Sequence, residues 1–189
     1  GYFYATVTDS LVSDSTTGQY LYTVIPANRY TIRKVSFTGD SAGPAGYIQQ
    51  IASESLLKSG NPYDFDVIKT ERERIDNWLK EKGFYLFNPD YILMRVDSTV
   101  GNHQVDIHTV VKKETPRSAM RQWYINNVYI YPNYEPSADS IAIDSSFWHQ
   151  RYFIIDPAKA YKPKVFNRTI FFKPGEVYNR TDHNKTLNR

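Results

Sequence analysis

The feature of this sequence that most constrains its fold is a repeat. Tyr30–Phe37 reads YTIRKVSF and Trp123–Ile130 reads WYINNVYI, and both contain an Ile-x-x-Val step that breaks the strict alternation of a β-strand at the same place. A second match follows in the same order, since KSGNPY at Lys58–Tyr63 is similar to KPGEVY at Lys173–Tyr178. Matches in a fixed order predict that the chain is built from similar structural units.

Two shorter echoes extend this order. GFY at Gly83–Tyr85 is similar to GYF at Gly1–Phe3, and IHTVV at Ile107–Val111 is similar to LYTVI at Leu21–Ile25. Each echo is weak by itself, but together the matches place the end of one unit before a whole unit and the start of another. The sequence therefore predicts three staggered units, of which only the middle one is complete.

The repeats also set the expected domain boundaries. Residues 1–29 are expected to be the closing hairpin of a preceding unit, residues 30–115 a complete unit, and residues 120–189 the first part of a following unit. The matched segments lie further apart in the third unit than in the second, which predicts an insertion near residues 137–163. We therefore expect units that are truncated at both ends of the chain.

The complete unit is expected to run strand, helix, helix, strand, strand. Hydrophobic periodicity favours a strand over Tyr30–Phe37 and a short helix over Tyr47–Lys58. After a longer helix, Tyr91–Asp97 and Val105–Val111 alternate apolar and polar residues, and a polar loop with one glycine joins them as a hairpin. This order predicts an α+β fold.

The longer helix, over Asp66–Lys82, has clear ends in the sequence. Asp64 is a suitable N-cap, and Gly83 is the residue type expected just after a helix C-terminus. The apolar side chains expected on its buried stripe are Phe65, Ile68, Ile75, Trp78 and Leu79. The charged side chains expected on the opposite, solvated face are Lys69, Glu73, Asp76 and Lys80.

The composition excludes several classes of protein. A hydrophobic fraction of 41% and a charged fraction of 23% are those of an ordinary folded chain, and a net charge of +3 is too weak to indicate nucleic-acid binding. The absence of cysteine excludes a disulfide framework and a thiolate zinc site. No apolar run approaches the ~18 residues of a membrane span. The 16 tyrosines suit strands and binding surfaces.

No catalytic or metal-binding constellation is evident. Glu71 and Glu73 point to different faces of the expected helix, and the neighbours Asp182 and His183 are poor evidence for a proton relay. Metal-ligand spacing is lacking among the four histidines, which are His103, His108, His149 and His183. We therefore expect no enzyme activity, no cofactor and no metal site.

Two motifs in the central unit carry a family resemblance. L-K-x-G-x-x-Y-D at Leu57–Asp64 and E-R-x-R-I-x-x-x-L-K-x-x-G-F-Y at Glu71–Tyr85 resemble the POTRA domain. POTRA domains are the periplasmic repeats that precede the barrel of BamA/TamA-type outer-membrane assembly proteins. The final segment, Phe172–Arg189, is similar to the last such repeat of the TamL branch of Bacteroidota.

The resemblance implies a fold, a location and partners. It implies tandem POTRA domains of order β-α-α-β-β, each a three-stranded mixed sheet with two helices on one face. It implies a periplasmic region attached to the outer membrane, with no direct membrane insertion by this fragment. The implied partners are outer-membrane protein precursors, the C-terminal barrel of the same chain and an envelope protein of the TamB type, and nucleic acid is not among them.

The resemblance also implies a binding surface. In this family the first strand of the closing hairpin is an exposed edge, here Phe84 to Val96, and an edge strand can accept an extended client by β-augmentation. The groove between this edge and helix Asp66–Lys82 is the expected docking surface. The candidate partner-binding residues are Phe84, Tyr85, Leu86, Phe87, Tyr91, Leu93, Met94 and Arg95. Core packing is the alternative role for the aromatic run Phe84–Phe87.

A different class of function remains open. Exposed aromatic side chains could form a binding surface for single-stranded nucleic acid or for a glycan. A nucleic-acid surface needs basic side chains among its aromatic ones. Only Arg95 lies among the strand aromatics, so the sequence favours a protein-binding module.

Overall fold

The computed structural model describes residues 2–13, 17–134 and 147–188. The chain divides into two compact units, one formed by Gly1–Arg74 with Asp90–Lys113 and the other by Ile75–Pro89 with Glu114–Arg189. None of the described helices combines the length and the apolar character that a membrane span requires.

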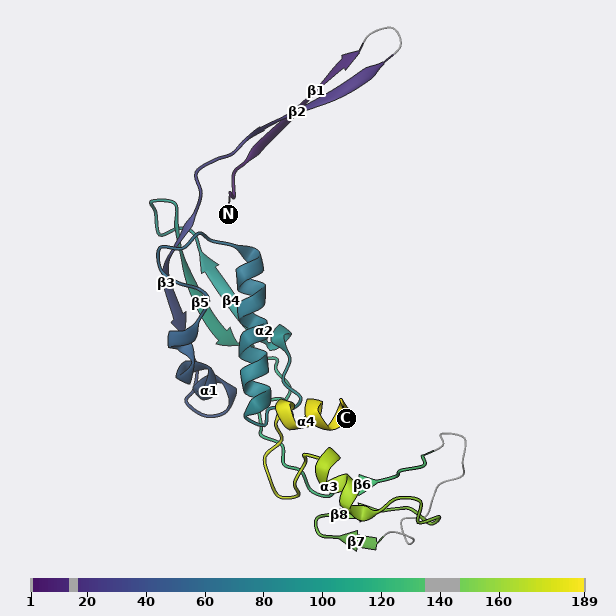
Figure 1. Cartoon of the computed structure of the whole chain (residues 1–189). Helices are drawn as coiled ribbons and strands as arrows, with labels where there is room; N and C mark the ends of the chain where they lie inside the picture. Colours follow the sequence, from purple (N-terminus) through teal and green to yellow (C-terminus); the bar gives the residue numbers. More distant parts are fainter. Residues whose placement is uncertain (1, 14–16, 135–146, 189) are drawn as a thin grey trace. The chain divides into compact units, whose positions relative to one another are not determined.

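The first unit contains two sheets (Figure 1). Strands β1 (Thr6–Ser13) and β2 (Gly18–Ile25) pair in antiparallel orientation, and every residue of the two strands is exposed. Strands β3 (Thr31–Phe37), β4 (Ile92–Asp97) and β5 (Gln104–Val111) form a sheet of order β3-β5-β4, with β3 parallel and β4 antiparallel to β5. The three strands expected in the complete unit are therefore confirmed to within one residue.

Two α-helices accompany the three-stranded sheet. They are α1 (Pro44–Gln50) and α2 (Phe65–Glu81), and short 3-10 helices occupy Ala52–Glu54 and Pro89–Tyr91. The helix expected over Tyr47–Lys58 is wrong in extent, because a proline at the first helical position starts α1 earlier and the segment after it turns into a 3-10 helix.

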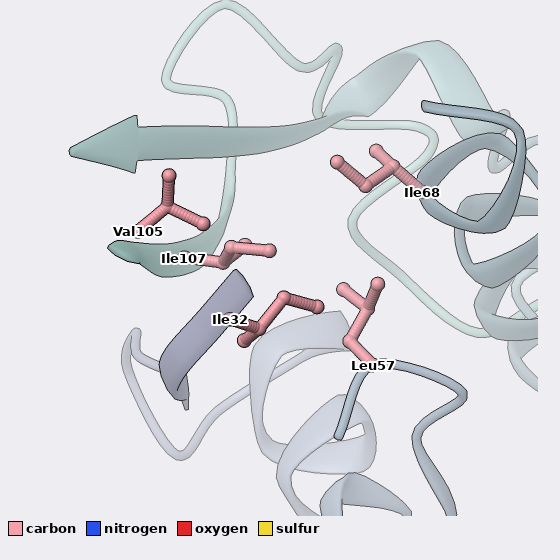
Figure 2. Packing of buried hydrophobic residues seen from close by; sticks show 5 residues of the cluster. All are labelled: Ile32, Leu57, Ile68, Val105 and Ile107. Atoms are coloured by element: carbon pink, nitrogen blue, oxygen red, sulfur yellow. The ribbon is translucent and has the colours of Figure 1, made fainter. Parts of the chain in front are cut away.

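The core of the first unit lies between the sheet and α2. Figure 2 shows five buried side chains that converge from β3, β5, α2 and the segment after the first 3-10 helix. These side chains are Ile32, Leu57, Ile68, Val105 and Ile107. Met94 and Val96 of β4 pack against this cluster, so β4 presents alternate side chains to the core as its sequence pattern predicts.

The two ends of α2 are formed as expected. The Asp64 carboxylate accepts a hydrogen bond from Asp66 N at 2.9 Å, which is the N-cap interaction. At the other end Gly83 has a φ of 93°, Phe84 N donates to Leu79 O at 3.0 Å, and Gly83 N is 3.4 Å from Lys80 O. These two bonds are the pattern of a Schellman motif, in which a left-handed residue ends the helix and satisfies its last carbonyl groups.

The buried face of α2 differs from the expected stripe. Ile68, Ile75 and Leu79 are buried as expected, but Phe65 is 69% exposed. Asp76, expected on the solvated face, is buried and bonds to Lys80 Nζ at 2.7 Å. Periodicity identified the apolar residues of the stripe but not the acidic residues buried beside them.

Glu71 is the most completely buried acidic residue of α2. It has no exposed surface, Arg74 donates two hydrogen bonds to its carboxylate at 2.8 Å, and Leu56 N donates a third at 3.0 Å. A carboxylate buried on this scale is tolerated only when its oxygens are bonded. Glu71 therefore holds the segment around Leu56 against the helix.

We expect Glu71→Ala to destabilise the protein by about 1–3 kcal/mol, because the backbone N–H of Leu56 would lose its buried acceptor. Urea unfolding followed by circular dichroism measures the change. Glu73→Ala is the matched control, since Glu73 is exposed on the same helix and should change stability by less than about 0.5 kcal/mol. Equal effects of the two substitutions would contradict this role of Glu71.

A β-bulge interrupts β3 where the Ile-x-x-Val step occurs. The register shifts between Ile32 and Lys34, which leaves Arg33 as the extra residue. Arg33 donates two hydrogen bonds to the Asp106 carboxylate, at 2.8 and 2.6 Å. These bonds lower the pKa of Asp106 below its ordinary value of 3.8, against the opposing effect of burial. The bulge is thus tied to β5 by an ion pair.

The Arg33–Asp106 pair should make the stability of the fold depend on pH in the acidic range. Because the folded-state pKa of Asp106 is lowered, the pair contributes fully at pH above the ordinary value of 3.8 and loses its contribution as pH falls below it. We expect Asp106→Asn to lower Tm near neutral pH and to lower it progressively less below about pH 4. Thermal unfolding of both proteins across this range tests this, and a Tm difference independent of pH would contradict it.

The second unit contains a second three-stranded sheet. Its strands are β6 (Tyr129–Ile130), β7 (Phe147–His149) and β8 (Tyr152–Ile154), in the order β6-β8-β7, with β6 parallel and β7 antiparallel to β8. Tyr152 and Ile154 are buried with Phe166, against which Val128, Ile130 and Ile170 pack. The helices that follow are a 3-10 helix at Pro163–Val165, α3 (Phe166–Thr169) and α4 (Arg180–Leu187).

The segment expected to be an insertion contains two of the strands of the second sheet. They are β7 and β8, which pair with each other, and β8 also pairs with β6. Residues 137–146 lie outside the described residues. The strands β7 and β8 have three residues each and are too short to be predicted from periodicity.

The matched segments of the two repeats make the same backbone hydrogen bonds. Ile32 N donates to Asn61 O at 2.8 Å and Gly60 N donates back to Ile32 O at 2.8 Å. In the other repeat Ile125 N donates to Glu176 O at 2.9 Å and Gly175 N donates to Ile125 O at 2.7 Å.

The equivalence continues through the tyrosine that follows. Tyr63 N donates to Tyr30 O, and Tyr178 N donates to Trp123 O, both at 2.9 Å. The next residue caps a helix in each repeat, Asp64 for α2 and Asn179 for α4. The segments are equivalent in structure as well as in sequence.

Candidate partner-binding edge

Strand β4 is an edge of its sheet. Within the described part of the chain it pairs only with β5. Lys112 N donates to Tyr91 O at 2.8 Å, and alternate residues of an antiparallel strand bond to the same neighbour. Leu93 and Arg95 therefore direct their backbone groups to β5, whereas the N–H and C=O groups of Ile92, Met94 and Val96 point outward. These outward groups are the ones that an added strand would bond.

The expectation that this strand begins at Phe84 is wrong. The strand begins at Ile92, and the preceding residues form turns and a 3-10 helix. The N–H of Phe84 closes the Schellman motif of α2, Tyr85 N bonds to Gly83 O at 2.8 Å, and Phe87 N bonds to Phe84 O at 3.0 Å. Backbone groups that are satisfied in local turns cannot form a strand ladder.

The aromatic run divides into buried and exposed members. Phe84 and Phe87 are 1% and 2% exposed, which confirms core packing for these two residues. Tyr85 and Leu86 are 44% and 42% exposed. The residues from Phe84 to Phe87 belong to the second unit, and Tyr91 to Arg95 belong to the first.

On the β4 side, Tyr91 and Leu93 are half-buried, Met94 packs against the core, and Arg95 is exposed. The side chains of Leu93 and Arg95 alternate with the core-facing ones, so they lie on the open face of the sheet. Arg95 is opposite His108 of β5, whose Nδ1 is 2.7 Å from Ser36 Oγ. The candidate edge therefore has an apolar side and a polar side.

Tyr85 lies in a polar hollow of the second unit. The hollow has a volume of about 340 Å³ and is lined by Lys80, Tyr85, Leu86, Tyr178, Arg180, His183 and Asn184. The rings of Tyr85 and Tyr178 are 4.6 Å apart, and Tyr178 Oη is 3.1 Å from His183 Nδ1. Burial raises the pKa of Tyr178 above its ordinary value.

Sequence reasoning named Tyr85 and Leu86 but missed the other residues of this hollow. Arg180 Nη1 donates to Asn77 Oδ1 at 2.6 Å and lies 3.5 Å from Asp76 Oδ2, the oxygen that also accepts from Lys80 Nζ. The available signal was the match of Tyr63 with Tyr178. Phe3 packs on Tyr63 at 5.0 Å as Tyr85 packs on Tyr178, so the GYF and GFY echoes mark equivalent ring contacts.

The described ranges contain no group of three histidine, aspartate or glutamate side chains arranged to hold a metal ion. The chemistry that the β4 edge offers is backbone hydrogen bonding next to apolar and cationic side chains.

Comparison with known proteins identifies the architecture. No family model and no curated protein matches the chain. The crystal structure of Haemophilus influenzae BamA POTRA3-5 is similar, with a TM-score of 0.52 and 16% identity, over 98% of this chain and 60% of that chain. The chain has the POTRA fold. The N-terminal domain of Omp85 from Thermosynechococcus elongatus aligns over 100% of this chain and 64% of that one, with 13% identity and a TM-score of only 0.30.

The POTRA fold confirms the expected α+β class with mixed three-stranded sheets. Within this fold Gly83 joins α2 to the start of the next repeat. Its carbonyl accepts a hydrogen bond from Trp123 N at 2.8 Å, and Lys82 O accepts one from Gln122 Nε2 at 2.7 Å. A Cβ at Gly83 would also collide with Val177 Cγ1. The close approach and the positive φ both require glycine here.

We expect Gly83→Ala to destabilise the second unit more than Gly60→Ala destabilises the first. Both glycines have positive φ, 93° and 86°, which costs an alanine about 1–2 kcal/mol. A Cβ at Gly60 meets open space, whereas one at Gly83 adds overpacking of about 1–3 kcal/mol. Chemical denaturation of both variants measures the difference, and equal losses would contradict the close approach.

Proposed function

We propose that this chain is the periplasmic POTRA region of an outer-membrane protein assembly or translocation factor and that it binds extended segments of outer-membrane precursors at β4. The observation that carries the proposal is the row of outward backbone groups at Ile92, Met94 and Val96 on an edge strand. The POTRA fold supports it, because the similar solved structure is of BamA POTRA domains.

The proposed mechanism is β-augmentation. An unfolded precursor strand would add beside β4 and pair with its outward N–H and C=O groups, so affinity would come from the main chain and not from a particular sequence. Alternate side chains of the client would face the open side of the sheet, where Leu93 and Arg95 lie. This mode suits a receptor for many different barrel strands, which share alternation but not sequence.

We further propose that the chain belongs to the BamA/TamA family, near the TamL branch, and that it has no enzyme activity. It would be attached to the outer membrane through a C-terminal barrel and would have an envelope partner of the TamB type. We propose the domain division in the same way, with residues 1–29 as a closing hairpin, 30–115 as a complete POTRA domain and 120–189 as the start of another. The exposed β1–β2 hairpin supports this division, since its second strand matches β5 in sequence.

One observation bears on the alternative of a glycan or nucleic-acid surface. Three aromatic side chains meet across the second sheet, since Phe153 lies 5.0 Å from Tyr129 and 4.8 Å from Trp148. The rings of Tyr129 and Phe153 are stacked on each other with an interplanar angle of 17°. Stacking covers only one face of each of these two rings, and Tyr129 and Trp148 are 41% and 54% exposed, so this cluster is the surface on which a base or sugar would stack under the alternative.

Proline at Met94 tests the β4 edge. Met94→Pro removes one outward N–H and is tolerated by an edge strand, so binding of a ten-residue peptide from an outer-membrane barrel strand should fall at least about tenfold. Met94→Ala is the matched control, because it removes the same core-facing side chain but keeps the N–H, and it should retain most of the affinity. Fluorescence anisotropy of the labelled peptide measures both.

Leu93→Pro separates edge binding from folding. Its N–H points to β5, so this substitution should disrupt the β4–β5 ladder and lower Tm, unlike Met94→Pro. If Met94→Pro binds the peptide as well as Met94→Ala, the β4 edge is not the binding site.

A further inference from the structure

The sheet of the first unit has a second edge, at β3. The first part of this edge is covered, because Ile32 exchanges backbone hydrogen bonds with Gly60 and Asn61. Beyond the bulge, Thr38 N donates to Thr109 O at 3.0 Å, so the even-numbered residues from Lys34 onward bond to β5. The backbone groups of Val35 and Phe37 therefore point away from β5, and no described strand pairs with them.

A hollow follows this part of the β3 edge. It has a volume of about 500 Å³ and lies between β3 and the segment from the first 3-10 helix to Ser59. Val35, Phe37 and Leu57 give it apolar walls, and Lys34 and Lys58 give it positive charge, whereas Arg33, which also lines it, is paired with Asp106. No acidic side chain is present among the residues described as lining it. The hollow thus combines unpaired backbone groups, apolar surface and cations.

The second unit shows a strand in the corresponding place. Val128 and Ile130 match Val35 and Phe37 in the repeat, and their carbonyl groups accept hydrogen bonds from Phe153 N and Ile155 N, both at 2.9 Å. Strand β8 is thus added, in parallel, to the strand that matches β3.

Side-chain packing shows that the two edges correspond. Val35 packs against the helix-side cluster of the first unit, and Val128 and Ile130 pack against the cluster that contains Phe166 of α3. In a strand of L-residues, the face to which a side chain points fixes the edge to which its own N–H and C=O point. When each sheet is viewed from its helix-covered face, β8 lies on the same side of β6 as the unpaired edge lies on β3.

We propose that the outer edge of β3 is a second strand-binding site, distinct from β4, which takes an extended polypeptide segment in parallel orientation with an acidic side chain opposite Lys34. The inference rests on the strand-receiving role proposed above but uses a different edge and a different orientation. The bound segment would place an aromatic or branched side chain beside Val35 and Leu57, as β8 places Tyr152 beside Val128.

The register of β8 fixes where the acidic side chain belongs. Tyr129 pairs with Phe153 and Ile130 with Ile154, so two steps further back Arg151 is opposite Asn127. Asn127 matches Lys34 in the repeat. A segment bound to β3 in this register would place the residue at the Arg151 position next to Lys34, which favours an acidic residue there and disfavours arginine.

The test uses the full chain, labelled with ¹⁵N, and two peptides. One peptide has the sequence of residues 150–157, QRYFIIDP, and the other carries Arg151→Glu. We expect chemical-shift changes and slowed amide exchange at Val35 and Phe37, with the Arg151→Glu peptide binding about two- to fivefold more tightly, the range of an exposed ion pair. Changes confined to β4 would overturn the proposal while leaving the β4 function standing.

Two variants assign the site. Val35→Pro should abolish peptide binding at β3, whereas Val35→Ala, which keeps the N–H, should retain it, and Met94→Pro should leave it unchanged. Lys34→Glu alters an exposed side chain and should reverse the preference between the two peptides even if Val35→Pro does not fold. Equal binding by Val35→Pro and Val35→Ala, or an unchanged preference in Lys34→Glu, would overturn the proposal. Loss of barrel-strand binding in Met94→Pro alone would still support the β4 site.

Discussion

The need to satisfy backbone hydrogen bonds at the margins of a three-stranded sheet underlies the other features of this structure. Two of three strands in such a sheet have one unpaired side, and unpaired N–H and C=O groups attract any extended chain. At β3 the segment Gly60–Asn61 covers the first part of the edge. At the matching strand of the next repeat, Gly175 and Glu176 cover the first part and β8 covers the rest. The stretches of edge that remain unpaired are those at which we propose that extended segments bind.

Short sequence patterns predict much of the fold. Alternation predicted β4 and β5 because each has one face on a core, the broken alternation in the β3 segment corresponds to its bulge, and residue type alone located both ends of α2. The repeats predicted equivalent strands, and the structure adds that their hydrogen bonds are the same. These signals work because each depends on residues that are close together in the sequence.

The errors have three different causes, which are a competing local turn, a long-range contact and strands of only a few residues. The family resemblance implies an edge strand from Phe84, but the N–H of Phe84 is needed to close the helix before it. Asp76 was placed in solvent by helical periodicity, but Arg180, more than a hundred positions later, lies beside it. Strands β7 and β8 have three residues each, too few for any period to be recognised. For the candidate site, the family resemblance implied an edge strand that includes β4, and only the hydrogen bonds between β4 and β5 showed which backbone groups of β4 face outward.

The single extra residue in β3 has a consequence for sequence comparison in general. By inserting Arg33, the strand brings both Ile32 and Val35 to the helix-covered side, which an uninterrupted pleat cannot do with a spacing of three. Two apolar residues three positions apart within a strand therefore indicate a bulge. At that point the backbone groups that face outward change from even-numbered to odd-numbered residues, or the reverse. Where this spacing recurs in a repeat array, the amino-acid sequence alone can locate the backbone N–H and C=O groups that face outward.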